Sequence, residues 1–254
     1  MSTDPAAGLV SFEGAAVPVR DDMRAAHARF WERLAGPGSW WTGAERVAIA
    51  AETRAARDCA LCAERREALS PNAVQGEHDR PAAAPSRLPA AAVEAVHRIT
   101  TDATRLGESF VSGLAAEGVD DGRYVELLGI VVAVTSTDFV CRGLGAPLHP
   151  LPAPVAGVPS GYRPAEARPG DAFVPMIPSS AIGPNERDLW QGTTGNVIRA
   201  MSLVPDAVRD LKLLSAAHYL PTAQVVDATC RRTLSRPQTE LVAGRVSALN
   251  ECFY

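Results

Sequence analysis

Two cysteines separated by two residues are the part of this sequence whose types and spacing best suit chemistry. Cys59 and Cys62 follow an apolar helical stretch, and Arg57, Arg65 and Arg66 flank them. Two sulfurs at this spacing can reach disulfide distance. Backbone N–H dipoles and nearby cations stabilise the thiolate, which is the reacting form of the thiol. The pattern therefore predicts either a redox pair or half of a metal site.

The metal alternative is weaker on sequence grounds. A zinc site needs two ligands beyond the cysteines, and His78 is the one candidate close in sequence. Covalent haem would need a histidine directly after the second cysteine, where the chain has Ala63. We therefore expect no metal. We also expect no organic cofactor, because no glycine-rich nucleotide loop occurs. A further alternative stays open, in which both thiols are small buried apolar groups.

The neighbourhood of the pair recurs at the end of the sequence. TGAERVAIAAETRAARDCALC and SRPQTELVAGRVSALNECFY each contain a helix cap, a polar first turn, an apolar helix and an acidic residue before cysteine. Cys252 then corresponds to Cys59, and the equivalent of Cys62 would be residue 255, one beyond Tyr254. We expect a partial internal repeat. One hypothesis for its end is an in-frame UGA codon read as selenocysteine, because a selenol is ionised at neutral pH.

Helical patterns surround both cysteine segments. The 44 alanines favour close-packed helices, and caps, glycines and prolines mark the expected ends. Thr42 and Glu45 form a capping box, and the very apolar stretch after Asp120 and Asp121 is expected at the centre of the core. The expected helices cover residues 21–34, 42–62, 90–107, 106–119, 124–145, 187–202, 205–219 and 237–252.

Proline divides the chain. Ten of the 20 prolines lie between Pro147 and Pro184, and no helix persists at that density. We therefore expect a tail at 1–20, a helical domain at 21–150, a proline-rich arm at 151–186 that packs on a surface, and a second half-repeat at 187–254.

Composition excludes several classes of function. The net charge is −4, which provides no basic field for nucleic acid. The longest uncharged apolar run, Leu127 to Thr137, is too short to cross a bilayer. The first residues carry acids and do not form a secretory signal, and the five cysteines are an odd number, so a disulfide framework is not expected. We expect a cytoplasmic protein without a membrane or nucleic-acid partner.

Three segments resemble the alkylhydroperoxidase D (AhpD) and carboxymuconolactone decarboxylase superfamily. Residues 42–66 resemble its motif helix, 113–149 resemble the helix pair that closes the same domain, and 196–252 resemble the opening of the peroxidase-related branch. The resemblance implies an all-α, AhpD-like helical bundle that forms homo-oligomers. It also implies an antioxidant, thiol-dependent oxidoreductase that reduces a hydroperoxide or another small molecule and is recycled by a thiol reductant protein.

The family's redox motif is a Glu, eleven residues, Cys-x-x-Cys, three residues and a His. In the family the second cysteine attacks peroxide, the first resolves it, and Glu and His relay protons. By this resemblance Cys59 and Cys62 are catalytic, but Val47 and Arg66 stand at the two relay positions. Arg66 could stabilise a thiolate, although an arginine cannot shuttle protons near neutral pH.

The second copy supplies Glu240 and Cys252 as a truncated catalytic centre by the same resemblance. The family often has an acid where Glu126 stands, which makes Glu126 a supporting residue, although a glutamate at the start of a helix also satisfies helix N–H groups. Two other functions stay open. One is a non-catalytic structural or ligand-binding protein, and the other is a decarboxylase-like enzyme with a polar, basic pocket near Glu126 and Arg142.

The other histidines and cysteines are given structural interpretations. His27 and His97 are expected on helix surfaces and His149 in the linker. A satisfied core or helix-end position is expected for His218. Cys141 and Cys230 are expected to be buried.

Overall fold

The protein is described here by a computed structural model that places residues 8–192, 194–225, 227–230 and 233–249. Within these ranges the regular structure is helical, and the β pairing consists of one isolated bridge between Arg168 and Met176. The expected all-α class is confirmed. The AhpD-like arrangement and the internal repeat remain predictions.

The connections between the helices differ in length, and the two longest are residues 68–89 between α3 and α4 and residues 144–195 between α6 and α7. Their bounds are α1 (Asp21–Ala35), α2 (Gly43–Ala56), α3 (Ala60–Glu67), α4 (Ala90–Asp102), α5 (Glu108–Ala116), α6 (Asp121–Gly143), α7 (Asn196–Arg199), α8 (Pro205–His218), α9 (Thr222–Val225) and α10 (Arg236–Leu249). Three single-turn 3₁₀ helices lie at Pro71–Ala73, Ala103–Arg105 and Pro184–Glu186.

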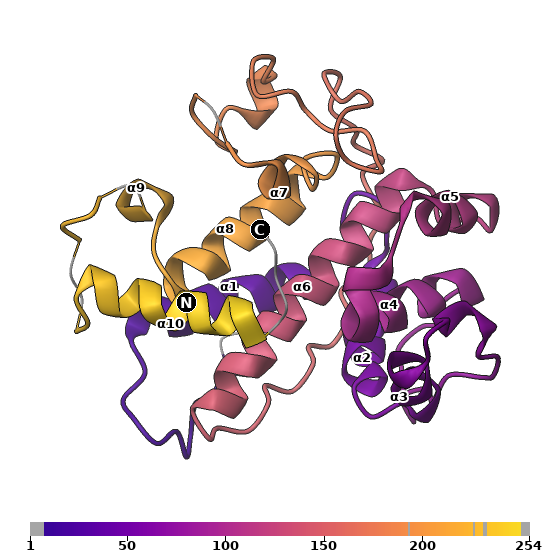
Figure 1. The fold of residues 1–254 in the computed structure, drawn as a ribbon, viewed down its shortest axis with the longest axis horizontal. Helices are drawn as coiled ribbons and strands as arrows, with labels where there is room; N and C mark the ends of the chain where they lie inside the picture. Colours follow the sequence, from indigo (N-terminus) through magenta and orange to yellow (C-terminus); the bar gives the residue numbers. More distant parts are fainter. Residues whose placement is uncertain (1–7, 193, 226, 231–232, 250–254) are drawn as a thin grey trace.

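Helix α6 is the centre of the molecule, as its apolar sequence predicts. Its neighbours are α2, α4, α5 and α8, which surround it (Figure 1). The Asp120 side chain accepts a hydrogen bond from the Arg123 backbone N–H at 2.9 Å and caps the first turn. Gly145, with a φ of +71°, turns the chain away after the last turn.

One continuous hydrophobic core joins the helices before and after the proline-rich segment. Helix α8 packs on α1 and α6, and its buried residues belong to the same cluster as those of α1, α2, α4 and α6. Pro205 occupies the first turn of α8, where its missing N–H has no helical partner to lose. The expected helix at 205–219 is confirmed, and residues 187–218 share the core of residues 21–150.

The expected helix at 42–62 is two helices. The capping box between Thr42 and Glu45 starts α2 as predicted, but the chain leaves the helix after Ala56. The backbone of Cys59 is extended, with φ −72° and ψ 124°. The Asp79 carboxylate accepts the Ala60 N–H at 2.7 Å and helps to start α3. This corner puts the cysteine pair at a helix N-terminus.

The proline-rich segment is extended and packs on the helical body, as expected. Its backbone N–H groups at Val155 and Gly161 donate to the carbonyls of Ala35 and Ser39, both at 2.8 Å. Ile177 is fully buried, and its N–H donates to the Ser202 hydroxyl at 2.8 Å.

The expected helix at 187–202 is largely wrong. Among its described residues only Asn196–Arg199 form an α-helix, because Gly192 adopts a φ of +68° and Gly195 precedes the short turn in an extended conformation.

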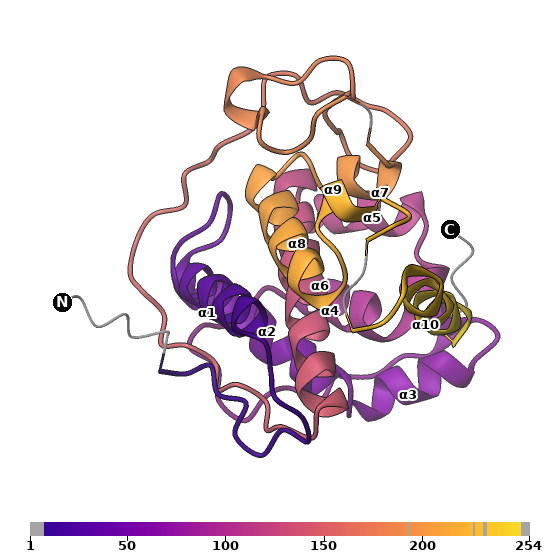
Figure 2. The same cartoon turned by 90° about the vertical axis from the view of Figure 1, so that its left-hand side faces the viewer.

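Helix α10 lies at the periphery (Figure 2). All its described side chains are exposed or half-buried, including the large apolar Leu241, Val246 and Leu249. By length and composition, α6 could cross a membrane, but two thirds of its apolar stretch is buried within the protein. Such burial is typical of the core helix of a soluble fold, so the length of α6 is weak evidence for a membrane.

Candidate metal centre

Four side chains from three parts of the chain converge at the corner between α2 and α3. Cys59 directly precedes α3, Cys62 lies in its first turn, His78 comes from the loop before α4, and His97 lies on α4. The thiols are free, and Cys59, Cys62 and His97 are 0–2 % exposed. His78 is 9 % exposed and forms the outer face of the group.

The sulfur and nitrogen atoms of this group are at metal-ligand spacing. Nδ1 of His78 lies 3.6 Å from both sulfurs, and Nδ1 of His97 lies 3.2 Å from Sγ of Cys62. One donor atom from each residue can be chosen so that all four lie within 4.8 Å of one another. Zinc bonds of about 2.3 Å to sulfur and about 2.0 Å to nitrogen place these atoms about 3.6 Å apart in a tetrahedron. The observed spacings are close to that value.

Each histidine uses its second ring nitrogen to contact a carboxylate. Nε2 of His78 lies 2.8 Å from Glu94, and Nε2 of His97 lies 3.3 Å from Glu52. These contacts turn both Nδ1 atoms toward the sulfurs and, in a neutral metal-bound imidazole, keep the proton on Nε2. Metal-bound histidines in proteins almost always have such a partner.

Arginines complete the outer layer. Arg65 donates to both carboxylate oxygens of Glu94 at 2.9 Å, and Arg80 donates to Glu52. Each guanidinium thus lies on a carboxylate that also contacts an imidazole. Desolvation raises the pKa of Glu94, but the bonds from His78 and Arg65 outweigh it and lower that pKa to about 2.

The group is also electrostatically polarised. Burial raises the pKa of Cys62, but hydrogen bonds from His78 and His97 outweigh burial and lower it to about 6. Burial lowers the pKa of His78, but bonds to Cys62, Glu94 and Cys59 outweigh it and raise it to about 10. A thiolate and an imidazolium therefore face each other near neutral pH. A metal ion would replace the imidazolium proton.

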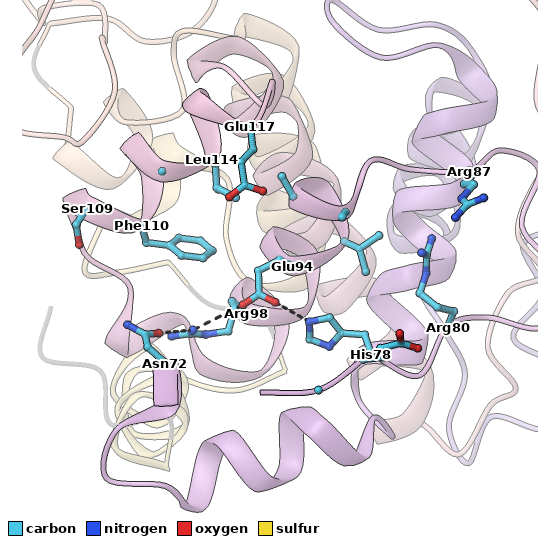
Figure 3. A pocket seen from close by; sticks show the side chains of 16 residues that line it. Asn72, His78, Arg80, Arg87, Glu94, Arg98, Ser109, Phe110, Leu114 and Glu117 are labelled. Carbon is cyan, nitrogen blue, oxygen red and sulfur yellow. Dashed lines mark hydrogen bonds and ion pairs between the residues drawn. The ribbon is translucent and has the colours of Figure 1, made fainter. Parts of the chain in front are cut away.

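A cavity of about 760 Å³ adjoins the outer face of the group (Figure 3). His78 and Glu94 lie on one wall, and Arg98, which donates to Asn72 at 2.9 Å, continues it. Phe110 borders the cavity from α5 (Figure 3). The cysteines are not among its lining residues, so the sulfurs lie behind His78.

The arginines expected to stabilise the thiolates do not contact them. Arg66 has an exposed side chain, and Arg57 stacks on the Phe139 ring at 4.4 Å. The sulfurs instead contact His78 and His97, and the Thr101 side chain also bonds to Cys62.

The contacts of Glu126 do not include the cysteine pair or its histidines. It forms a buried ion pair with Arg46 and accepts the Trp40 N–H at 2.6 Å. Arg142 lies sixteen residues further along α6, or about 24 Å at 1.5 Å per residue, and is exposed. The two residues therefore cannot line one pocket, which removes the basis of the decarboxylase-like alternative.

The second predicted centre is only partly described. Glu240 lies on α10, where it accepts hydrogen bonds from Tyr219 and Arg236. Cys252 lies outside the described residues.

Sequence reasoning missed three members of the centre and misplaced two histidines. The expectation that His27 and His97 lie on helix surfaces is wrong, because both are 0 % exposed. A signal for His97 existed: it follows Val93 by four residues, and so it shares the apolar face of its helix. Glu52 and Glu94 carried no local signal, because their partners come from other segments.

Comparisons with protein-family models, with curated proteins and with solved structures found no match.

Proposed function

We propose that Cys59, Cys62, His78 and His97 bind one zinc(II) ion and that this ion holds the α2–α3 corner, the His78 loop and α4 together. The observation that carries the proposal is the convergence of four donor atoms within 4.8 Å, with the second nitrogen of each histidine on a carboxylate. This function belongs to the structural or ligand-binding class that the sequence left open.

The donor set favours zinc. Two thiolates and two imidazoles suit a tetrahedral zinc ion, whereas magnesium and calcium prefer oxygen ligands. Two thiolates also neutralise the charge of the ion, which matters at a buried site. Four protein ligands leave no open position, and this is the pattern of structural zinc sites.

The packing of α3 gives such an ion a role. Cys59, Leu61 and Cys62 form a small buried cluster with Val74, separate from the main core. Little apolar area therefore secures this corner. A bound zinc ion supplies folding free energy directly, because the ligand site does not exist in the unfolded chain.

Thiol-dependent peroxide reduction is the second candidate, and one observation favours it. Glu94–His78 and Glu52–His97 each form an acid–histidine chain ending at a sulfur. These chains could relay protons to the sulfurs, although Val47 and Arg66, at the relay positions of the sequence motif, could not. The cavity beside His78 offers a place for a hydroperoxide.

In that chemistry the Cys62 thiolate attacks the peroxide oxygen and becomes a sulfenic acid. The alcohol leaves with a proton from His78. The Cys59 thiol then displaces water to form a disulfide, and an external dithiol protein reduces the disulfide at the expense of its own oxidation. The step needs metal-free thiols, so the two functions exclude each other in one molecule at one time.

Metal analysis of the full chain, purified under reducing conditions, separates the candidates. We expect about one zinc per chain, lost in Cys62→Ser and His97→Gln and retained in Cys230→Ser, whose thiol lies outside the cluster. Purified protein without zinc, whose thiols consume hydroperoxide and lose that activity in Cys62→Ser, would instead establish the peroxidase. If the protein contains no zinc and consumes no hydroperoxide, the thiols are interpreted as small buried apolar groups.

A further inference from the structure

A second group of histidine and cysteine side chains lies at the C-terminal end of α6. Cys141 comes from the last turns of α6, His27 from α1 and His149 from the start of the proline-rich segment. We propose that these three residues bind one copper(I) ion in three-coordinate geometry, at a site independent of the Cys59–His97 cluster.

The donor atoms converge on one point. Nδ1 of His27 lies 2.9 Å from Nε2 of His149, and that Nε2 lies 3.5 Å from Sγ of Cys141. All three donor atoms lie within 4.8 Å of one another. One sulfur and two imidazole nitrogens form the trigonal set found in copper sites.

The surroundings favour a low coordination number. Cys141 and His27 are 0 % exposed and His149 is 1 % exposed. The ring of Phe12 lies 5.2 Å from that of His27 and 4.9 Å from that of His149, and Trp31 packs edge-on against His149 at 5.5 Å. These apolar walls limit access of water as a fourth ligand. Copper(I) accepts three ligands, whereas zinc(II) prefers four.

Charge balance supports the monovalent ion. One thiolate neutralises copper(I), so the buried unit carries no net charge, whereas zinc(II) would leave one positive charge without compensation. The nearby charged groups are Asp138 and Arg54, which cancel because they pair with each other at 2.7 and 2.9 Å.

The outer hydrogen bonds leave the donor nitrogens free for a metal. If Nδ1 of His27 binds the ion, its Nε2–H donates to Nε2 of His218 at 2.7 Å. Nδ1–H of His218 then donates to the Ser136 hydroxyl at 2.8 Å. His149 has its own outer partner in the backbone of Ser11. Each ligand histidine is thus oriented by a second contact, as metal-bound histidines are.

The histidines are also in the ligand form. Burial lowers the pKa of His27 to about 3 and that of His149 to about 4, so both are neutral at physiological pH. Burial raises the pKa of Cys141, so binding releases one proton from the thiol. Without a metal, the His27 and His149 nitrogens share a single hydrogen bond, which the ion would replace.

Anaerobic titration of the zinc-loaded full chain with copper(I), against a chromophoric copper(I) chelator, tests the site. We expect one copper(I) bound without zinc release, and X-ray absorption of that protein to show one sulfur and two nitrogens around copper. Cys141→Ser and the volume-conserving His149→Gln should each lower the copper(I) affinity at least about 10-fold. Cys230→Ser, the matched control, should not change it.

Three results would overturn the assignment. Copper(I) that displaces zinc and shows two sulfurs has entered the Cys59–His97 cluster instead. Equal copper(I) binding by the wild-type chain and both variants means that these residues are not ligands. Zinc(II) that fills the site as tightly as copper(I) contradicts the three-coordinate geometry. The absorption measurement uses the unaltered chain, so it decides the question even if a variant fails to fold.

Discussion

At the scale of single residues, Cys62 and His78 each shift the pKa of the other in the metal-free protein. The pKa of Cys62 falls from 9.0 to about 6, so the thiolate's contribution to stability is complete above pH 9 and is lost as the pH falls through 6. The pKa of His78 rises from 6.5 to about 10, so its contribution is complete below pH 6.5 and is lost as the pH rises through 10. Both groups are charged between these two shifted values.

We predict that one thiol of the chelator-treated protein ionises near pH 6. The ultraviolet absorbance of the thiolate, followed against pH, measures this directly. His78→Gln should move the midpoint back toward 9, because the imidazolium no longer donates to the sulfur. Glu64→Gln changes an exposed side chain on α3, the helix that carries Cys62, and should leave the midpoint unchanged. A midpoint near 9 in the unaltered protein would contradict the thiolate–imidazolium pair of Cys62 and His78.

We also predict that Glu94→Gln weakens zinc binding about 10- to 100-fold without removing a ligand, because the amide no longer fixes the His78 ring as an anion does. Competition with a zinc-selective chromophore gives the affinity. The exposed Glu64→Gln is again the control. Equal affinities for Glu94→Gln and the wild-type chain would mean that the carboxylate does not support the site.

Local spacing explains which site residues the sequence could predict. Cys59, Cys62 and His78 lie within twenty residues, so their proximity is readable along the chain. His97 lies 35 residues beyond Cys62, and only the packing of α4 against α3 brings it to the sulfur. The Cys141 group spans still longer separations, 122 residues between His27 and His149. Such groups follow from topology, which the sequence alone does not provide.

At the scale of helices, the contact between α6 and α8 is set by small side chains. A Cβ at Gly129 would lie 2.8 Å from the Ala207 Cβ, whereas a Cβ at Gly113 on α5 would meet nothing within 4 Å. We predict that Gly129→Ala destabilises the fold by about 1–3 kcal/mol, because neither helix can yield without losing its packing.

Gly113→Ala is the matched control for that change. It should stabilise the protein by up to about 1 kcal/mol, because alanine is the better helix former and no contact opposes it. Chemical denaturation of both variants gives the two free energies of unfolding. A stabilised Gly129→Ala variant would mean that α6 and α8 are not in close contact.

The sequence predicts a helix end where the capping residue is a neighbour in the chain. It does not predict an end that is set by a contact with a distant segment. Thr42, Asp120 and Pro205 mark observed helix starts in their own sequence neighbourhood. The break before α3 has no proline or glycine, and its stabilising contact comes from Asp79, nineteen residues after Ala60. At 187–202 the expected helix is interrupted at Gly192 and Gly195.

At the scale of the whole molecule, the proline content correctly predicts that the proline-rich segment is extended. It does not follow that the helices before and after this segment fold as independent units. Helix α8 covers faces of α1 and α6 that would otherwise expose core residues. Burial of apolar area, rather than position along the chain, defines the cooperative unit. Helices α1, α2, α4, α6 and α8 therefore share one main hydrophobic core, with small separate clusters at Cys59–Cys62 and at Cys141, and no described residue of α10 belongs to that core.

We predict that hydrogen exchange of the full chain reports this division. Amides of α6 and α8 should exchange only through global unfolding and should show the same denaturant dependence, because the two helices share one core. Amides of α10 should exchange at a much lower free energy, since no side chain of that helix is buried. Gly129→Ala should lower the protection of α6 and α8 by equal amounts and leave α10 unchanged. Exchange of α8 at lower denaturant than α6 would show instead that the segment after the proline-rich stretch opens independently.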